Sequence, residues 1–285
     1  MNRAINHNLA IYDRVSKRSS RLVTRSYSTS FSIGINLLDN SIRDAIYAIY
    51  GFVRLGDEIV DTFVMQDREE LLKAYREETH LALARGISLN PVLHQFQKIA
   101  NRFQIDRELV DAFFQSMEMD LLSKHYKKEC YNQYIYGSAE VVGLMCLKVF
   151  CDGDETRYKK LVEPARKLGS AFQKVNFLRD IRQDREELGR FYFPNLGDRK
   201  LDIETKNRIV AEIEEEFTVA REGISQLPTK ARAGVTVAYT YYRQLLAQLK
   251  CTPPDKIHRM RIRISTPMKC YLLVKTLFRH SLNRI

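Results

Sequence analysis

Two pairs of aspartates, each four residues apart, constrain the fold of this chain more than any other feature. The first pair is Asp57 and Asp61, and the second is Asp180 and Asp184. Both lie in segments whose apolar residues recur every three or four positions, which is the pattern of an amphipathic helix. Four residues make just over one helical turn, so the two carboxylates of each pair point the same way and repel each other. Two such pairs require something to offset the repulsion, and a divalent cation is the first candidate.

The composition favours an all-α fold in one domain. Of the 285 residues 45% are hydrophobic, only 12 are glycine and 7 are proline, and no Gly/Pro/Ser-rich linker divides the chain. We therefore predict a single domain spanning residues 1–285. The hydroxyl-rich residues 26–32 are expected to form a loop with caps for the next helix. The apolar spacing predicts helices over 3–22, 41–64, 67–85, 91–101, 106–124, 130–150, 154–184, 202–225, 228–249 and 266–282.

The net charge of +11 is concentrated at the two ends of the chain. Residues 1–30 carry six Lys or Arg against one acid, residues 251–285 carry eight against one, and the part between is nearly neutral. Basic ends on a neutral body indicate an anionic partner such as a diphosphate or a membrane surface, although solvated helix faces give the same pattern. A nucleic-acid partner is not expected, because the charge is split between both ends and no DNA- or RNA-binding signature occurs.

The cysteines and the N-terminus point to the cytoplasm. The five cysteines are odd in number and include no C-x-x-C pair, which disfavours a disulfide framework or a zinc site and fits a reducing compartment. The N-terminus lacks the apolar core of a signal peptide, and no run approaches about 18 apolar residues. We expect a soluble or peripheral cytoplasmic protein, and the sequence makes no prediction of its oligomeric state.

Each aspartate pair belongs to a longer polar stripe on an apolar helix. Because these stripes run down otherwise apolar segments, they are predicted to face an internal cavity. Carboxylate and amide oxygens suit Mg²⁺, with Mn²⁺ as the alternative, bridging to a diphosphate, whereas zinc would want His or Cys. One D-x-x-x-D alone is most often a solvent-facing coincidence, so the evidence lies in the repetition. The stripes are Tyr50, Arg54, Asp57 and Asp61 on the first helix, and Gln173, Asn176, Asp180 and Asp184 on the second.

These segments resemble the motifs of the squalene/phytoene synthase family, the head-to-head prenyl synthases. Residues 50–61 are similar to Y-x-x-x-R-x-x-D-D-x-x-D, and residues 173–184 to Q-x-x-N-x-x-R-D-x-x-x-D. Residues 28–31 match S-x-S-F, residues 134–145 match Y-x-Y-x-x-A-G-x-V-G, and residues 189–194 match G-R-x-Y-x-P. The motifs occur in family order from about residue 20 to 195. The resemblance implies a class I isoprenoid synthase helical bundle around a central cavity.

Two residues depart from the family pattern. Glu58 stands where the first motif has its middle aspartate, but both outer aspartates are kept. Glu140 stands where the central helix has a small glycine, so we expect it to reshape the prenyl pocket. The resemblance weakens after residue 200, where Tyr242 and Arg261 are counterparts of late residues that reach the diphosphate.

The resemblance also implies a role for individual side chains. Asp57, Asp61, Asn176, Asp180 and Asp184 would hold Mg²⁺ against the diphosphate, and the aspartates would act in catalysis together with Arg54 and Tyr136. The aromatic rings expected to stabilise cations are Tyr50, Tyr136, Phe172, Phe177 and Tyr192, although such aromatics are more often core residues. Substrate contacts are implied for Ser28, Ser30, Tyr50, Arg54, Gln173, Asn176, Arg179, Arg190, Tyr192, Tyr242 and Arg261.

The implied reaction joins two geranylgeranyl diphosphates to phytoene through a cyclopropylcarbinyl diphosphate, as in carotenoid biosynthesis. No NADPH is expected, because no dinucleotide fingerprint occurs. The alternatives are a dehydrosqualene or squalene synthase that uses farnesyl diphosphate, a single-substrate terpene cyclase, and a non-catalytic family relative that acts as an assembly factor. Because the product is an insoluble hydrocarbon, the basic segment with Lys256, Arg259, Arg261, Arg263 and Lys269 is predicted to rest near an anionic membrane.

Overall fold

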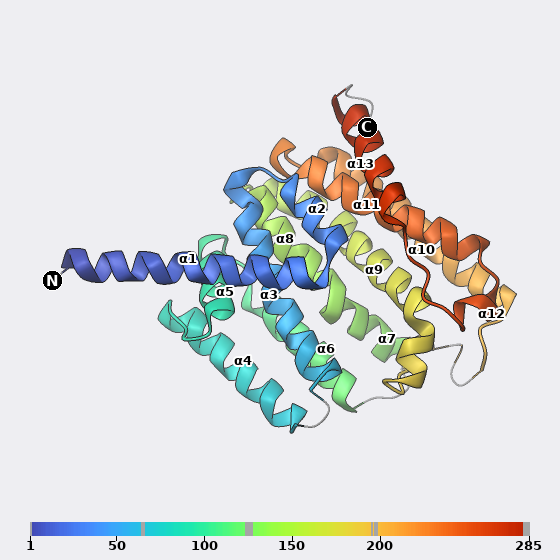
Figure 1. Ribbon diagram of the computed structural model, residues 1–285, viewed down its shortest axis with the longest axis horizontal. Coiled ribbons are helices and arrows are strands. Elements are labelled where there is room, and N and C mark those ends of the chain that lie inside the picture. Colours follow the sequence, from blue (N-terminus) through green and yellow to red (C-terminus); the bar gives the residue numbers. More distant parts are fainter. Residues whose placement is uncertain (1, 64–65, 123–127, 195, 197–198, 282–285) are drawn as a thin grey trace.

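A computed structural model describes residues 2–63, 66–122, 128–194, 196 and 199–281, and in these ranges every regular element is a helix (Figure 1). The all-α prediction is therefore confirmed. The predicted helix ends at residues 64, 124 and 282 lie outside the described residues. The helices are α1 (Asn2–Tyr27), α2 (Thr29–Asn36), α3 (Asn40–Asp61), α4 (Arg68–Arg85), α5 (Pro91–Arg102), α6 (Arg107–Leu122), α7 (Lys128–Ile135), a π-helical turn (Tyr136–Glu140), α8 (Val141–Cys151), α9 (Glu155–Glu186), α10 (Ile203–Gln226), α11 (Thr229–Cys251), α12 (Pro254–Ile257) and α13 (Thr266–Ser281).

Side-chain caps set the beginnings of several helices. Asp39, Asp67, Asn90, Asp154 and Asp202 each accept hydrogen bonds from backbone N–H groups in the first turn of the following helix. Such caps satisfy donors that have no partner within the helix and are worth about 1 kcal/mol each. The helices that follow these five caps begin within one residue of the beginnings predicted from apolar spacing.

The loop predicted over residues 26–32 is wrong. α1 continues to Tyr27 and α2 begins at Thr29, which leaves Ser28 as the single non-helical residue. The Ser28 hydroxyl accepts a hydrogen bond from the Phe31 backbone N–H, so the expected cap is present. Because one serine caps α2 directly, the chain turns between two helices without a loop.

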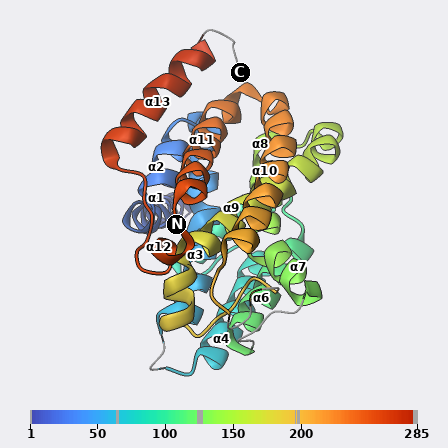
Figure 2. The ribbon, with the colours of Figure 1, turned by 90° about the vertical axis from the view of Figure 1, so that its right-hand side faces the viewer.

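The core is built from aromatic side chains that several helices contribute. Phe52 of α3 stacks on Phe96 of α5 with ring centroids 4.0 Å apart, and it also contacts Tyr75, Phe113 and Phe114. This cluster fixes α3 against α4, α5 and α6. A second cluster joins α7, α9, α10 and α11 on the other side of the molecule. Figure 2 shows α9, α10 and α11 together on this side of the bundle.

One segment is apolar and long enough to cross a membrane by length and composition alone. It is Lys128–Cys151, which comprises α7, the π-helical turn and α8. More than half of its apolar window (56%) is buried inside the protein, as is usual for a core helix.

Candidate functional site

A cavity of about 500 Å³ lies between α2, α3, α8, α9, α10 and α11. Its far end is apolar, and its mouth carries the polar stripes of α3 and α9. The expectation that the stripes face an internal space holds for Tyr50, Arg54 and Asp57 of the first stripe and for Gln173 and Asn176 of the second, whereas Asp61, Asp180 and Asp184 are not lining residues. The predicted site residues that line the cavity are Ser28, Tyr50, Arg54, Asp57, Gln173, Asn176, Arg179, Tyr242 and Arg261.

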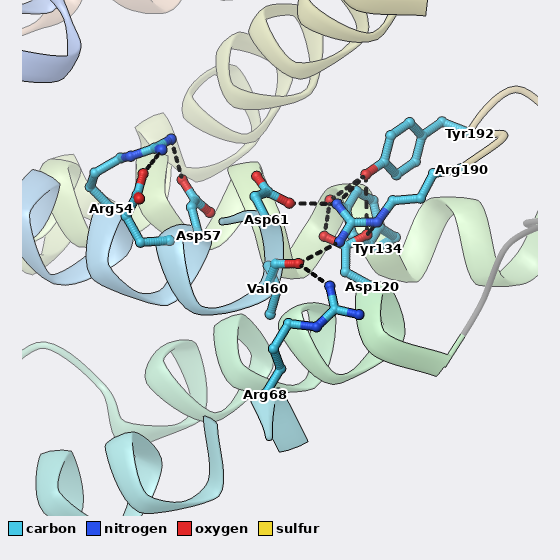
Figure 3. A network of polar contacts seen from close by, with 10 residues as sticks. Arg54, Asp57, Val60, Asp61, Arg68, Asp120, Tyr134, Arg190 and Tyr192 are labelled. Carbon is cyan, nitrogen blue, oxygen red and sulfur yellow. Dashed lines mark hydrogen bonds and ion pairs between the residues drawn. The ribbon is translucent and has the colours of Figure 1, made fainter. Parts of the chain in front are cut away.

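On α3, Arg54 organises the carboxylates. Its guanidinium forms an ion pair with Glu58 and lies 3.9 Å from the Asp57 carboxylate (Figure 3). It also stacks on the Tyr27 ring, 4.3 Å from the ring centroid. Glu58 is buried, and its charge is met by Arg54. The departure from the family motif at Glu58 therefore leaves the outer aspartates in place.

On α9, cationic and aromatic side chains surround the second stripe. Asp180 forms ion pairs with its neighbour Arg179 and with Arg261, whose Nε lies 2.7 Å from Asp180 Oδ1. The Tyr242 hydroxyl donates to Asn176 Oδ1 at 3.3 Å. The counterparts inferred after residue 200, Tyr242 and Arg261, thus both reach this stripe from the C-terminal third of the chain.

An aromatic collar lies just inside the mouth. The Phe31 ring of α2 lies 5.9 Å from Tyr50, 6.2 Å from Phe172 and 5.9 Å from Tyr242, measured between ring centroids. Tyr50 and Phe172 were predicted as cavity aromatics. Phe31 was not predicted to face the cavity, because its place in the S-x-S-F motif does not indicate which wall it faces.

The carboxylates of the two helices repel one another across the mouth. Burial and the nearby Asp61 carboxylate raise the pKa of Asp57 to about 8. Burial and the carboxylates of Asp180 and Asp61 raise the pKa of Asp184 to about 8 as well. Since Asp61 on α3 acts on Asp184 on α9, the two stripes converge at their carboxylate ends. Such a place favours positive charge.

A second polar network fastens the segment after α9 to α3 and α6 (Figure 3). Arg190 donates to Asp61 Oδ1 at 2.6 Å and to the Val60 carbonyl at 3.1 Å, and its Nε lies 3.7 Å from Asp120 Oδ1. Asp120 accepts from the hydroxyls of Tyr134 at 2.7 Å and Tyr192 at 3.1 Å. Sequence reasoning missed Asp120, because it is one of several acids on α6 and belongs to no motif.

Some predicted site residues lie away from the cavity. Ser30 and Tyr136 are not among its lining residues, and the Tyr136 ring faces Arg166, 5.3 Å away. Phe177 stacks on Tyr192 at 4.1 Å within the second core cluster, so neither ring lines the cavity. Asp61, Asp180, Asp184 and Arg190 stand at or behind the rim.

Glu140 does not reshape the cavity with its side chain. Its carboxylate accepts from Arg166 Nε at 2.6 Å, and it is not a lining residue although its neighbours Ser138 and Ala139 are. Burial raises the pKa of Glu140, with the Arg166 hydrogen bond opposing the shift.

The carboxylates of the two stripes can bind a cation only if further ligands come from outside the protein. Among the described residues, no three His, Cys, Asp or Glu side chains gather closely enough to hold a metal ion. Asp61 and Asp180 are also engaged by Arg190, Arg179 and Arg261. Asp57 and Asp184, whose pKa values are raised, offer hard oxygen donors. Such donors fit an ion such as Mg²⁺ whose other ligands are substrate phosphates and water.

We predict that Asp120→Ala lowers the free energy of unfolding by about 3 kcal/mol, because it strips a buried carboxylate from Arg190 and two tyrosine hydroxyls. Chemical denaturation followed by circular dichroism measures the change. Glu118→Ala on the same helix is the control: its ion pair with Arg76 is partly exposed and should be worth less than about 1 kcal/mol. Equal losses in the two variants would contradict a structural role for the Asp120 network.

We also predict that the metal-free protein loses stability as pH rises. The pKa of Asp57 lies near 8 in the folded chain against an ordinary 3.8, so between these values the folded state keeps a proton that the unfolded state releases. Stability from this group therefore falls from about pH 4 to about pH 8.

Asp57→Asn removes that contribution. In EDTA, the drop in unfolding temperature between pH 5.5 and 8 should be smaller in Asp57→Asn than in the parent. The exposed Glu77→Gln on α4 should keep the drop of the parent. An unchanged drop in Asp57→Asn would show that the carboxyl is not held protonated.

Comparison with known proteins identifies the family of this chain. The sequence profile of the squalene/phytoene synthase family matches residues 24–268. The chain is 29% identical to a phytoene synthase from Arthrospira platensis over 257 residues, which cover 81% of this chain and 82% of that protein. It is 32% identical to a presqualene diphosphate synthase from Zymomonas mobilis over 187 residues, 64% of this chain and 62% of that protein.

Solved structures share the fold. The crystal structure of a dehydrosqualene synthase in complex with ligand aligns with a TM-score of 0.80 at 19% identity and covers 95% of this chain and 98% of that one. A squalene synthase from Alicyclobacillus acidocaldarius aligns with a TM-score of 0.73 at 23% identity, covering 84% and 95%. Members of the matching family are prenyltransferases that condense prenyl diphosphates head to head. With 245 consecutive residues matched by the profile and the motifs assembled around one cavity, the chain belongs to the squalene/phytoene synthase family.

Proposed function

We propose that this protein condenses two geranylgeranyl diphosphates to phytoene and releases diphosphate at each of two ionisations. The first would give a cyclopropylcarbinyl diphosphate, and the second, after rearrangement and loss of a proton, the hydrocarbon. No nicotinamide is needed for this outcome, because no hydride is added. The similarity to phytoene synthases supports the proposal.

The length of the cavity is the observation that favours the longer substrate. Along α9 the lining residues run from Arg179 at the mouth to Leu161 at the far end, and the hydrocarbon chain would lie along the part from Asn176 to Leu161. At 1.5 Å per residue this part of the wall is about 22 Å long. With about 1.3 Å gained per carbon–carbon bond, an extended geranylgeranyl chain measures about 20 Å and a farnesyl chain about 14 Å. The wall matches the longer chain, and farnesyl diphosphate with a dehydrosqualene or squalene product is the alternative.

We propose that the diphosphate binds at the mouth with Mg²⁺, or Mn²⁺ as the alternative. Asp57, Asp61, Asn176, Asp180 and Asp184 would hold the ion, which supplies Lewis-acid stabilisation of the departing diphosphate when bound. The raised pKa values of Asp57 and Asp184 support this, since positive charge there relieves the repulsion between carboxylates.

Side chains of the protein would stabilise the negative charge on the diphosphate and the positive charge on the allylic cation. Arg54, Arg179 and Arg261 line the mouth, where their guanidinium groups can donate to phosphate oxygens. When a diphosphate arrives, Arg261 can exchange its contact with Asp180 for the phosphate. Deeper in, the collar of Phe31, Tyr50, Phe172 and Tyr242 presents ring faces to an allylic cation and excludes water from it.

Mass spectrometry of the hydrocarbon formed from each prenyl diphosphate, with and without NADPH, tests the proposal. We expect phytoene from geranylgeranyl diphosphate and no dependence on NADPH. Asp57→Ala and Asp180→Ala should each lower turnover at least a hundredfold while helix content stays nearly unchanged, because each removes a carboxylate from one stripe. Release of no diphosphate from any prenyl substrate would instead support the non-catalytic alternative.

Shortening the cavity should change the substrate. Ala165 lines the α9 wall eleven residues before Asn176, about 16 Å along the helix. We predict that Ala165→Phe lowers kcat/KM for geranylgeranyl diphosphate at least tenfold relative to farnesyl diphosphate, because the ring fills the end that only the longer chain reaches. Ala84→Phe on the exposed side of α4 is the control. An unchanged ratio in Ala165→Phe would refute this length assignment.

We also propose that the protein works in the cytoplasm at a membrane surface, where an insoluble product can leave. The basic segment predicted to face the membrane is only partly available for that role. Arg261 turns inward to Asp180, and the Arg259 carbonyl accepts from Arg182 of α9. Binding to a membrane would therefore need basic or apolar residues from other parts of the protein surface.

A further inference from the structure

The first helix, α1, buries polar side chains and exposes apolar ones. Its fully buried side chains are Ser16, Ser20 and Thr24, each with 0% exposure. The opposite face, half a turn away, carries apolar side chains: Ile11, Val15 and Leu22 are 40%, 46% and 67% exposed. In an ordinary surface helix the apolar side chains point inward.

The face of α1 that packs on the protein needs small residues, which explains why serine and threonine are buried there. α1 packs closely on α3, where a Cβ added to Gly51 would lie 3.4 Å from the Ser20 Cβ. The buried hydroxyls of Ser20 and Thr24 donate to the carbonyls of Ser16 and Ser20 and so need no further partner. Packing within the chain gives no reason for the outward apolar residues.

Arginines accompany these apolar residues. Arg14, Arg18 and Arg25 are exposed and, at helical spacing, lie on the same outward side as Ile11, Val15 and Leu22. Among the described residues no acid pairs with them, unlike Arg21, which pairs with Asp44. The outer face of α1 therefore combines apolar and unneutralised cationic side chains.

α13 repeats the combination. Leu272 and Thr276 are buried on its inner side, and the helix packs on α11. Its outer side carries Tyr271, Val274 and Phe278, which are 58%, 67% and 64% exposed. Lys275 is exposed beside them, with its Nζ 5.5 Å from the Tyr271 ring centroid.

Both helices lie on the same side of the molecule. α1 packs on α2, α2 on α11 and α11 on α13, so the four form one continuous layer. Figure 1 shows α1 and α13 in front of the bundle, and after the turn in Figure 2 both lie at its left edge. Tyr27 at the end of α1 and Arg261 shortly before α13 also line the cavity. The layer thus borders the cavity mouth.

The charge and the apolar residues together select the occupant of this layer. A second copy of the chain would set one unneutralised cationic face against another. A nucleic acid would take the charge but leave the apolar side chains in water. An anionic bilayer accepts both, because basic side chains meet its headgroups while apolar side chains enter the boundary with the acyl chains. We infer that the outer faces of α1 and α13 dock this protein on an anionic bilayer, beside the cavity mouth.

The inference concerns binding alone and can be tested without substrate. The full chain is sedimented with vesicles of phosphatidylcholine, or of phosphatidylcholine with roughly one third phosphatidylglycerol. The parent should bind the anionic vesicles and release with added salt. Val15→Ser/Leu22→Ser, Arg18→Glu/Arg25→Glu and Val274→Ser/Phe278→Ser should each lower the partition coefficient about tenfold or more.

Leu122→Ser is the matched control, because Leu122 is 75% exposed at the end of α6, a helix outside this layer. It should bind vesicles like the parent. Circular dichroism and diphosphate release from detergent-dispersed substrate confirm that each variant folds, and they report on the proposed function separately. Vesicle binding lost with diphosphate release retained supports the inference.

Three results would overturn it. One is binding that ignores anionic lipid, and another is binding unchanged in all three double variants. The third is a parent that sediments as a dimer and variants that become monomers with vesicle binding intact, which would assign the layer to a second copy of the chain.

Discussion

Repulsion between carboxylates on two facing helices is the constraint on which the rest of this structure depends. Asp57 and Asp61 on α3 and Asp180 and Asp184 on α9 stand at the mouth of one cavity, and burial strengthens their mutual repulsion. The chain offsets part of it with arginines at the rim: Arg54 near Asp57, Arg190 on Asp61, and Arg179 and Arg261 on Asp180. These arginines contact the carboxylates at the rim, and the cavity beside them leaves room that the proposed cation and diphosphate would fill.

Holding such a site open needs rigid helices behind it. α3 is held by the stacked rings around Phe52, which lie on the side of α3 away from the cavity. α9 is held by a buried ion cluster: Lys174 contacts Glu212 and Glu216 of α10, and the Ser170 hydroxyl donates to Glu216. Lys174 follows Gln173 directly, so one residue faces α10 while its neighbour lines the cavity. Burying charges rarely adds stability, but breaking such a pair is costly, which fixes the register of α9 on α10.

The sequence was enough to predict the helices, both stripes and most of the cavity mouth, because these depend on local spacing. It was not enough where a choice depends on tertiary contacts. Tyr134 and Tyr136 are two residues apart and point to different sides of their helix, and only the fold shows that Tyr134 meets Asp120 while Tyr136 meets Arg166. The partners of Asp120 come from other elements, at residues 134, 190 and 192. No periodicity within α6 could have revealed them.

Glu140 shows how a departure from a family pattern can be absorbed. The narrow contact between the central helix and α9 is made at Gly169, where an added Cβ would lie 2.6 Å from the Ala139 carbonyl oxygen and 3.1 Å from the Glu140 Cα. The backbone of residues 139 and 140 thus touches α9. The Glu140 side chain points away from this contact and forms an ion pair with Arg166, which is also on α9. The close approach of the two helices therefore depends on glycine at position 169, which has no Cβ, and not on a small residue at position 140. Ala139 and Gly169 both line the cavity, whereas the ion pair of Glu140 with Arg166 lies outside its lining.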